Sequence, residues 1–217
     1  KLYFERHDGQ AVTCDDFAQA IADANPQSSL ANLLTQFKRW YSQAGTPRVH
    51  AHGVYNNSNL SYTLTLSQSC VKTPDQNHKE PFVIPVKVGL LNQQGQALFG
   101  HDKTLVLSEA SQSFVFENID SEPTPSLLRN FSAPVNLDCD LTDLQWLSIL
   151  AHDTDAFNRW EAGQRLAVQA ALRFIRGNHN PQTEPVLGAD YLEAMKAVLN
   201  HTDLDSAFKE LVLTLPS

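Results

Sequence analysis

The sequence contains few cysteines, and no motif pairs them. Its 217 residues include only Cys14, Cys70 and Cys139, which are far apart and form no C-x-x-C motif. Disulfide frameworks and thiolate zinc sites both use closely spaced cysteines. The spacing therefore disfavours these two classes and indicates a reducing compartment, so the expected location is the cytoplasm.

Clustered positive charge and long apolar runs are also scarce. The formal net charge is −8, and Lys and Arg form no stripe of the kind that binds a phosphate backbone. The most apolar stretch, residues 82–91, contains Pro85 and Lys87 and is far shorter than the roughly 20 residues of a membrane-spanning helix. We expect no nucleic-acid partner and no membrane segment. The chain begins at Lys1 without the apolar region of a signal peptide, and we expect it to be a piece of a longer protein.

Familiar catalytic motifs are absent as well. The sequence has no H-E-x-x-H motif, no G-x-S-x-G motif and no glycine-rich phosphate loop. Zinc hydrolysis, activation of a serine nucleophile and nucleotide binding each depend on one of these arrangements. We therefore expect this chain to carry no catalytic, cofactor-binding or metal-binding residue of its own.

Two sets of charged or ligand-type side chains come closest to a site. His50 and His52 could share one strand face, but the sequence offers no third ligand beside them, so we expect surface or packed histidines rather than metal ligands. A set of arginines follows one predicted helix and is expected to form a solvated face that pairs with Glu161. These are Arg159, Arg165, Arg173 and Arg176.

Residues near the start of the first predicted helix could suggest other chemistry. Cys14 lies where a helix N-terminus can lower the pKa of a thiol, yet a small packed residue or a bystander is the favoured interpretation. Asp15 and Asp16 are adjacent, so they point in different directions, and acidic residues in a first turn already stabilise the helix dipole. We expect them to cap the helix.

Aromatic side chains at helical spacing are the last candidates. Trp40, Tyr41, Phe157 and Trp160 could form platforms for a carbohydrate or a peptide. Large aromatic side chains more often lie in a core, because they bury the most area. We therefore predict packing roles for all four.

The periodicity of residues 1–45 is helical. Thr13 and Asp16 fit a capping box, followed by an apolar face at Phe17, Ile21 and Ala24. A second amphipathic helix is predicted from residue 30 to residue 41. Gly45 and Pro47 then provide the expected stop signals.

After Pro47 the hydrophobic period changes to two residues, which predicts strands. Residues 56–59 are a polar turn that predicts a hairpin. About seven strands at this spacing are typical of an immunoglobulin-like β-sandwich, here assigned to residues 46–138. The predicted strands are residues 49–55, 60–68, 82–91, 97–99, 104–107, 113–116 and 133–139.

Residues 139–217 return to a helical pattern. Thr142 and Gln145 form a second capping box, residues 153–155 cap the next helix, and Gly177 ends it. A polar loop through Pro181 is followed by further apolar periodicity, which predicts the beginning of an α-solenoid. One stripe of the long helix is predicted to be its buried face: Phe157, Trp160, Val168, Ala171, Leu172 and Ile175. The expected fold class is α+β.

Several long strings in this sequence resemble the bacterial aminopeptidase N family of zinc gluzincins. The resemblance covers essentially the whole chain. Its strings are residues 7–17 (HDGQAVTCDDF), 37–47 (FKRWYSQAGTP), 125–135 (PSLLRNFSAPV), 157–162 (FNRWEA) and 213–217 (LTLPS).

The resemblance implies a fragment from the C-terminal half of such an enzyme. It would comprise the helical tail of the catalytic domain (residues 1–45), a β-sandwich (residues 46–138) and the beginning of the C-terminal helical domain (residues 139–217). The family's zinc motif, its amine-binding motif and its oxyanion tyrosine have no match here, and Tyr41 belongs to a boundary string rather than to a zinc site. The parent would use zinc to remove N-terminal residues from peptides, with the upstream catalytic domain as this fragment's partner.

Two other interpretations remain open. The chain could be a stand-alone module whose sandwich and helices bind a peptide or a protein, because it has no catalytic constellation. It could also be a thiol hydrolase that uses Cys14, although no histidine is fixed beside that residue in the sequence.

Overall fold

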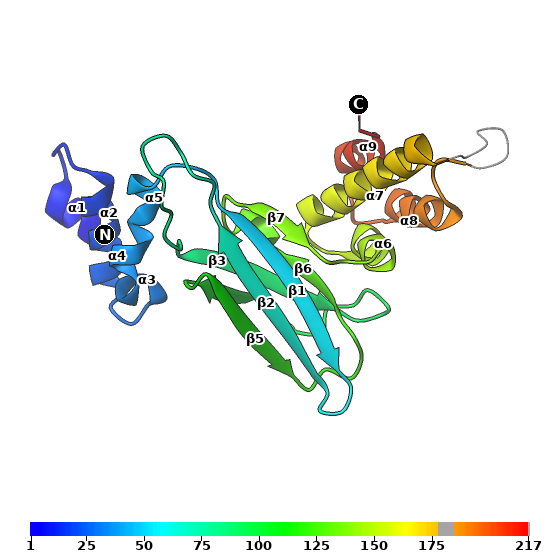
Figure 1. Cartoon of the computed structure of the whole chain (residues 1–217), viewed down its shortest axis with the longest axis horizontal. Helices are drawn as coiled ribbons and strands as arrows, with labels where there is room; N and C mark the ends of the chain where they lie inside the picture. Colours follow the sequence, from blue (N-terminus) through cyan, green and yellow to red (C-terminus); the bar gives the residue numbers. More distant parts are fainter. Residues whose placement is uncertain (178–184, 217) are drawn as a thin grey trace.

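The protein is described by a computed structural model that places residues 1–177 and 185–216. Three parts follow one another along the chain and through space (Figure 1). Short helices α1–α5 come first, strands β1–β7 form a β-sandwich in the middle, and helices α6–α9 lie at the other end. The α+β class predicted from the sequence is confirmed. In the described residues, none of the helices combines the length and the apolar character that crossing a membrane requires.

The first part consists of short helices rather than two long ones. Their bounds are α1 Leu2–His7, α2 Cys14–Ala24, α3 Ser29–Asn32, α4 Leu34–Phe37 and α5 Arg39–Ser42. The single helix predicted for residues 30–41 is wrong, because the backbone leaves helical geometry at Leu33, where φ is −112° and ψ is 15°, and turns again at Lys38. The capping box that begins α2 is confirmed, with Thr13 accepting a hydrogen bond from the Asp16 N–H.

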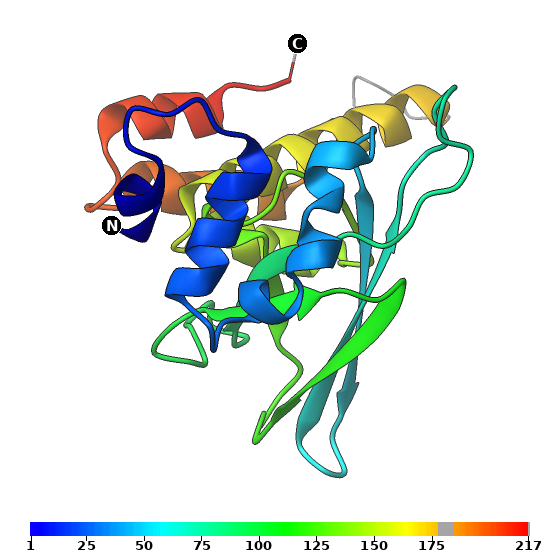
Figure 2. The same cartoon turned by 90° about the vertical axis from the view of Figure 1, so that its left-hand side faces the viewer.

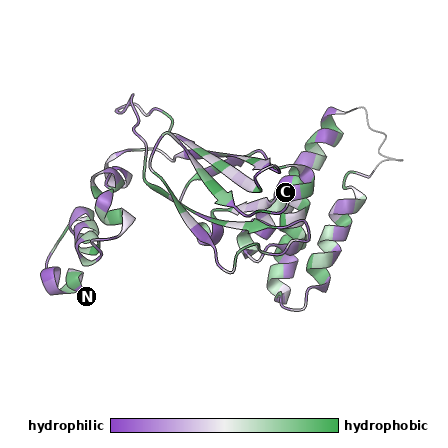
Figure 3. Ribbon diagram, turned by 90° about the horizontal axis from the view of Figure 1, so that it is seen from below, coloured by the Kyte–Doolittle hydropathy of each residue, from purple (hydrophilic) through white to green (hydrophobic). Residues whose placement is uncertain are grey.

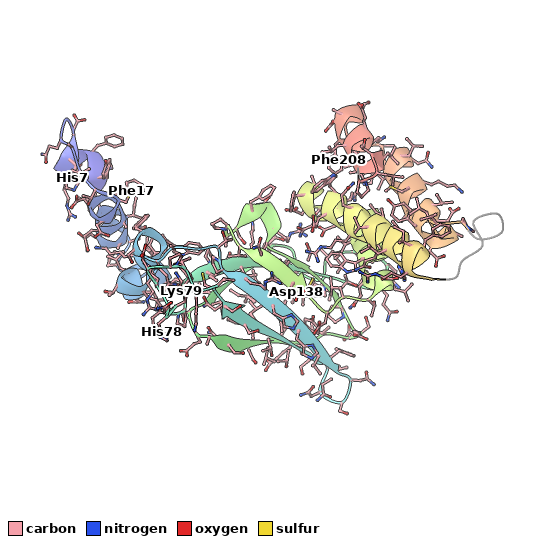
Figure 4. All side chains as sticks on the ribbon, turned by 45° about the horizontal axis from the view of Figure 1, so that its top comes forward. His7, Phe17, His78, Lys79, Asp138 and Phe208 are labelled. Atoms are coloured by element: carbon pink, nitrogen blue, oxygen red, sulfur yellow. The ribbon has the colours of Figure 1, made fainter. Side chains whose placement is uncertain are left out.

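The buried face of α2 is not the predicted one. Phe17, Ile21 and Ala24 are exposed, whereas the side chains that the fold buries are three alanines, Ala18, Ala20 and Ala22. Alanines let α2 lie close to its neighbours, while Phe17 turns outward and contacts Tyr3 with ring centroids 5.1 Å apart. Figure 4 shows Phe17 and His7 at the end of the molecule that is farthest from Phe208 of α9.

Two sheets form the sandwich. One has the strand order β5-β2-β1-β7 and the other has the order β4-β3-β6. All neighbours are antiparallel except β1 and β7, which run parallel. The β1–β2 hairpin extends well beyond both helical parts (Figure 2). The strands are β1 Arg48–Asn56, β2 Ser61–Ser69, β3 Ile84–Leu91, β4 Lys103–Leu107, β5 Ser111–Glu117, β6 Thr124–Leu127 and β7 Asn136–Cys139.

Most of the predicted strands occur, with two exceptions. Residues 97–99 form no strand and contribute only a single bridge, between Ala97 and Leu91. Conversely, β6 was not predicted, because Pro125 within it disfavours a strand assignment. Between the sheets, alternate residues fill a dry core that includes Val49, Leu64 and Leu66.

The last part is a set of helices whose N-termini are capped by side chains in three of four cases. Thr142 caps α6, Asp155 caps α7 and Asp205 caps α9. Gly177 follows the end of α7, as predicted, and the predicted polar loop through Pro181 lies outside the described residues. The helices are α6 Asp143–His152, α7 Ala156–Arg176, α8 Ala189–Asn200 and α9 Ser206–Leu213.

The buried face of α7 differs from the stripe that the sequence suggested. Val168, Leu172 and Ile175 are exposed, and Ile175 retains 76% of its accessible surface. The fold instead buries small residues such as Ala162 and Gly163, where an added Cβ would lie 3.3 Å from Leu150. Close approach of α6 therefore decides which face is inside. Figure 3 shows hydrophobic and hydrophilic residues alternating along the helices at this end of the molecule.

Candidate functional site

The histidine pair acquires carboxylate neighbours in the fold. His50 of β1 pairs in register with Asp138 of β7, and its Nδ1 lies 3.4 Å from Asp138 Oδ2. Asp140 Oδ2 lies 3.4 Å from His50 Nε2 and 2.9 Å from His52 Nδ1. The sequence analysis found no third ligand because these aspartates lie almost 90 residues farther along the chain, and only the parallel pairing of β1 with β7 brings them close. Figure 4 places Asp138 on the sandwich.

These four side chains form histidine–carboxylate contacts at the surface. Each side chain is between 41% and 59% exposed. Among the described residues, no group of three or more His, Cys, Asp or Glu side chains has an arrangement that could hold a metal ion. The residues present therefore do not fit a zinc ion.

The residues around the start of α2 have structural partners. Asp16 accepts hydrogen bonds from the Thr13 N–H at 2.9 Å and from its hydroxyl at 2.7 Å, and these bonds lower the pKa of the Asp16 carboxyl. Asp15 pairs with Lys38 at 3.6 Å. Capping by Asp16 is thus confirmed. Cys14, the first residue of α2, is exposed.

Trp40 joins α5 to the sandwich. Its indole Nε1 donates a hydrogen bond to the Val83 carbonyl at 2.8 Å, and its ring lies 4.6 Å from the Phe82 ring. The predicted packing role of Trp40 is confirmed. Phe157 lies at the other end of the sandwich, where its ring is 4.4 Å from Phe131 and 5.5 Å from Trp160.

The arginines of α7 divide into two kinds. Arg165 pairs with Glu161 at 2.7 Å, as predicted, and also donates to the Leu137 carbonyl of β7 at 3.0 Å. Arg159 is only 3% exposed, so its assignment to a solvated face is wrong. Burial lowers the pKa of its guanidinium, and the charge of Asp153 acts in the opposite direction.

The most concentrated polar cluster of the described residues surrounds Arg129, in the segment that follows β6. Its Nη1 donates to Asp153 at 2.6 Å and to the Ser126 hydroxyl at 3.0 Å, and its Nη2 donates to the Thr154 hydroxyl at 2.6 Å. Its Nε lies 2.9 Å from Asp102, an ion pair without the alignment of a hydrogen bond. One guanidinium thus contacts two residues of the sandwich and two residues that connect α6 to α7. We call this cluster the Arg129 joint.

A second set of bonds runs beside the guanidinium. Asp155 accepts from the Asn130 N–H at 2.8 Å with one oxygen and from the Asn158 N–H at 3.0 Å with the other. The Asn158 side-chain amide in turn donates to Ser126 and to the Leu127 carbonyl, both at 2.9 Å. The same carboxylate therefore caps α7 and holds the backbone that follows β6.

Burial makes these charges strongly dependent on each other. The Asp153 side chain has no exposed surface, and that of Arg129 is 9% exposed. Burial raises the pKa of the Asp153 carboxyl, while bonds from Ser126, the Asp155 N–H and Arg129 act against this shift. Among the described residues Asp153 Oδ2 and two nitrogens of Arg159 have no hydrogen-bond partner. Such a cluster is costly to disturb, because removal of one member leaves another buried and uncompensated.

Apolar contact beside the Arg129 joint is incomplete. A cavity of about 260 Å³ lies between the sandwich and helices α6 and α7, lined by residues that include Leu127, Leu137, Trp146 and Phe157. Cys139 also lines it, and burial raises the pKa of that thiol to about 11. The joint therefore offers buried charges and an inert thiol, an arrangement that can hold two bodies in a fixed orientation but shows no activated nucleophile.

Family comparisons define the class of the two larger parts. Residues 45–140 match a family described as "Domain of unknown function (DUF3458) Ig-like fold". Residues 143–217 match a family described as "Domain of unknown function (DUF3458_C) ARM repeats". The chain thus contains an Ig-like domain followed by ARM-type helical repeats.

Similarity to curated proteins extends over the whole chain. Aminopeptidase N of Escherichia coli (strain K12) is 42% identical over 100% of this chain, which covers 25% of that relative. Aminopeptidase N of Haemophilus influenzae is 38% identical, again over 100% of this chain and 25% of the relative. The whole chain therefore aligns with bacterial aminopeptidase N proteins, and it spans about a quarter of the length of these curated relatives.

A solved structure shows the same arrangement. The crystal structure of Legionella pneumophila aminopeptidase A in complex with aspartic acid matches 99% of this chain and 23% of that chain, with a TM-score of 0.80 and 28% identity. The helices, the Ig-like sandwich and the ARM helices therefore occur together in a second, related protein.

Two of the strings that carry the family resemblance meet at the Arg129 joint. Residues 125–135 supply Ser126, Arg129 and Asn130, and residues 157–162 supply Asn158, which bonds to Ser126. The sequence alone does not show that these residues form a cluster. The sequence feature that could have indicated it is the pair of aspartates in residues 153–155, for which we predicted only a helix cap.

Proposed function

We propose that this chain is a non-catalytic structural part of a zinc-dependent aminopeptidase N, whose full-length form removes N-terminal amino acids from peptides. The observation that carries the proposal is the alignment of the whole chain with a quarter of the Escherichia coli relative at 42% identity. We further propose three units: residues 1–45 as the tail of the catalytic domain, residues 46–138 as the sandwich, and residues 139–217 as the beginning of the helical domain.

Each unit has its own role in this proposal. The sandwich is a spacer, and helices α6–α9 begin the wall that encloses the catalytic cleft. The exposed aromatic side chains of the first helices, Phe4 and Phe17, are where the catalytic domain of the same polypeptide would pack. Large exposed apolar side chains on a small helical unit are typical of a surface that another body covers.

The chemistry of the full-length enzyme depends on a zinc ion that other residues of the polypeptide hold. When bound, such an ion polarises a peptide carbonyl and lowers the pKa of a bound water. The described residues of this chain offer no cluster that fits the ion, so their proposed contribution is to position and enclose. The proposed location is the cytoplasm, and the proposed substrates are short peptides with free N-termini.

The test is to determine the coding sequence that surrounds this chain. The proposal expects an H-E-x-x-H motif within the few hundred codons that precede Lys1. A start codon at Lys1 itself would contradict the proposal and favour the alternative, a stand-alone peptide- or protein-binding module.

A further inference from the structure

We propose that Arg129 is a positioning residue that fixes the angle between the Ig-like sandwich and the ARM helices. The inference rests on the proposed spacer role, since a spacer contributes to an enzyme only if it holds its neighbours at a defined angle. It adds to that role a specific device: one buried guanidinium that bonds to both sides.

The bonds of Arg129 run in two directions. On the sandwich side the guanidinium contacts Asp102 and Ser126, and on the helical side it contacts Asp153 and Thr154. A planar guanidinium presents its donors in a rigid fork, so bonds to two bodies restrict their relative rotation. The two helical-side bonds are each 2.6 Å long, the shortest of the set.

Apolar packing covers only part of this boundary. Leu91 of β3 packs among helical core residues such as Trp146 and Leu150. Beside it a pocket of about 260 Å³ lies between the sandwich and helices α6 and α7, so part of the boundary has no apolar contact. Apolar contact is not directional, and directional polar bonds therefore restrict the relative orientation in a way that apolar contact does not.

The backbone around Arg129 also depends on the helical side. Leu128, Asn130 and Phe131 all have positive φ, at 55°, 53° and 52°. Residues other than glycine occupy this region at an energetic cost, and they remain there when surrounding contacts hold them. The Asn130 N–H is held by Asp155, which belongs to the helical side. The strained segment and the helices therefore depend on each other.

The sandwich also leaves room for the guanidinium. Gly89 of β3 faces Arg129, and a Cβ at this position would lie 3.1 Å from Nη1 and 3.2 Å from Cδ. Contacts this close are tighter than most Cβ contacts in proteins. A glycine in the interior of a strand is unfavourable unless another group must approach closely. Here that group is Arg129.

The experiment measures the orientation directly. Spin labels are attached to cysteines introduced at Val115 of β5 and Glu193 of α8, which are 60% and 69% exposed, after Cys14, Cys70 and Cys139 have been replaced. Pulsed electron paramagnetic resonance gives the distribution of distances between the labels. The proposal expects a single narrow distribution for the parent chain and a distribution roughly two-fold broader for Arg129→Met.

Two further variants separate positioning from stability. Thr154→Val removes a partner on the helical side and is expected to broaden the distribution. Asp102→Asn removes the negative charge of a partner on the sandwich side and is expected to leave the width of the distance distribution unchanged, because Asp102 and Arg129 belong to the same body. Far-ultraviolet circular dichroism shows whether Arg129→Met folds. If it does not fold, the other two variants still test whether Arg129 fixes the angle between the sandwich and the helices.

The outcomes are distinct. Broadening in Thr154→Val but not in Asp102→Asn supports the proposal. An unchanged width in Thr154→Val, or equal broadening in both variants, overturns it. The result does not depend on whether the coding sequence holds a zinc motif, so failure of this inference and failure of the proposed function can be told apart.

Discussion

The two joints of this chain are built from different interactions. Where the first helices meet the sandwich, side chains bond to main-chain carbonyls: Trp40 to Val83, Gln36 to Ser108 and Gln43 to Glu80. Where the sandwich meets the ARM helices, Arg129 and Asp153 bond to each other away from solvent. A bond from a partly exposed side chain to a carbonyl, including the bond from Arg39 to Pro81, can be exchanged for water, whereas breaking a buried ion pair leaves an uncompensated charge. A single substitution should therefore cost little stability at the first joint and much more at the second.

The largest effect is expected from Arg129→Met, which leaves Asp153 buried without its counter-charge. We expect a loss of about 3–5 kcal/mol in the free energy of unfolding, measured by urea denaturation. The matched control is Arg173→Met, since Arg173 is 61% exposed and pairs with Asp143, and a loss below about 1 kcal/mol is expected there. Equal losses in the two variants would remove the distinction between the joints.

A smaller effect is expected at the other joint. Trp40→Ala removes a half-buried ring that packs on Phe82, and we expect a loss of roughly 2 kcal/mol. Trp40→Phe keeps an aromatic ring and loses only the bond to Val83, at a cost of about 1 kcal/mol. Hydrogen exchange should report faster opening of residues 14–42, with the sandwich unaffected. If Trp40→Phe cost as much as Trp40→Ala, the hydrogen bond rather than the ring would hold this joint.

The smallest effect concerns the pH dependence that arises from His152, the residue before Asp153. Burial and the charge of Arg159 lower the pKa of His152, which lies under the turn at Gly95. Below a pH of about 6.5 the unfolded chain therefore binds more protons than the folded chain. This contribution to stability is present above that pH and is lost as the pH falls through the folded value. Because His152 is largely exposed, we expect only a few tenths of a kcal/mol, about the size of an exposed charge interaction.

The measurement compares His152→Gln with the parent chain in urea at pH 7.5 and pH 5.5. The raised pKa of Asp153 has the opposite effect on the pH dependence of stability, because its contribution decreases as the pH rises above about 3.8. Both chains contain Asp153, so the difference between them isolates the histidine. A parent chain that loses no more stability on acidification than the variant would show that His152 is not coupled to folding.

Local sequence signals were enough for much of the fold. The capping boxes at Thr13 and Thr142 occur as predicted, because a hydroxyl and an acceptor three residues later are sufficient to satisfy the first turn of a helix. The alternation of apolar and polar residues predicted the long strands β1, β2 and β3, in which one face of the strand is largely buried. The family resemblance then indicated how the parts are combined.

The failures have a common physical cause in tertiary contact. On α7 the long apolar side chains look like a core face, yet close approach of α6 favours Ala162 and Gly163. On the same helix Arg159 is charged and yet buried, because Asp153 lies near enough to offset part of the cost. Neither the buried face of α7 nor the burial of Arg159 can be predicted from the periodicity of that helix alone.

The Arg129 joint was beyond sequence reasoning for a similar reason. Arg129 and Asp153 are 24 residues apart and belong to different structural parts. The sequence predicts the role of Asp155 as a helix cap, because Asn158 lies only three residues farther along the chain. It does not predict the second hydrogen bond of Asp155, from Asn130, because these two residues are distant in sequence. Only the long strings around these residues marked the region as unusual.

The central claim is that this chain supports an aminopeptidase without carrying its chemistry. The direct test is to incubate the purified chain with zinc, remove free metal by dialysis, and measure both bound zinc and hydrolysis of alanyl and arginyl amides. The account predicts no stoichiometric zinc and no turnover. Turnover by this chain that a chelator abolishes would contradict it.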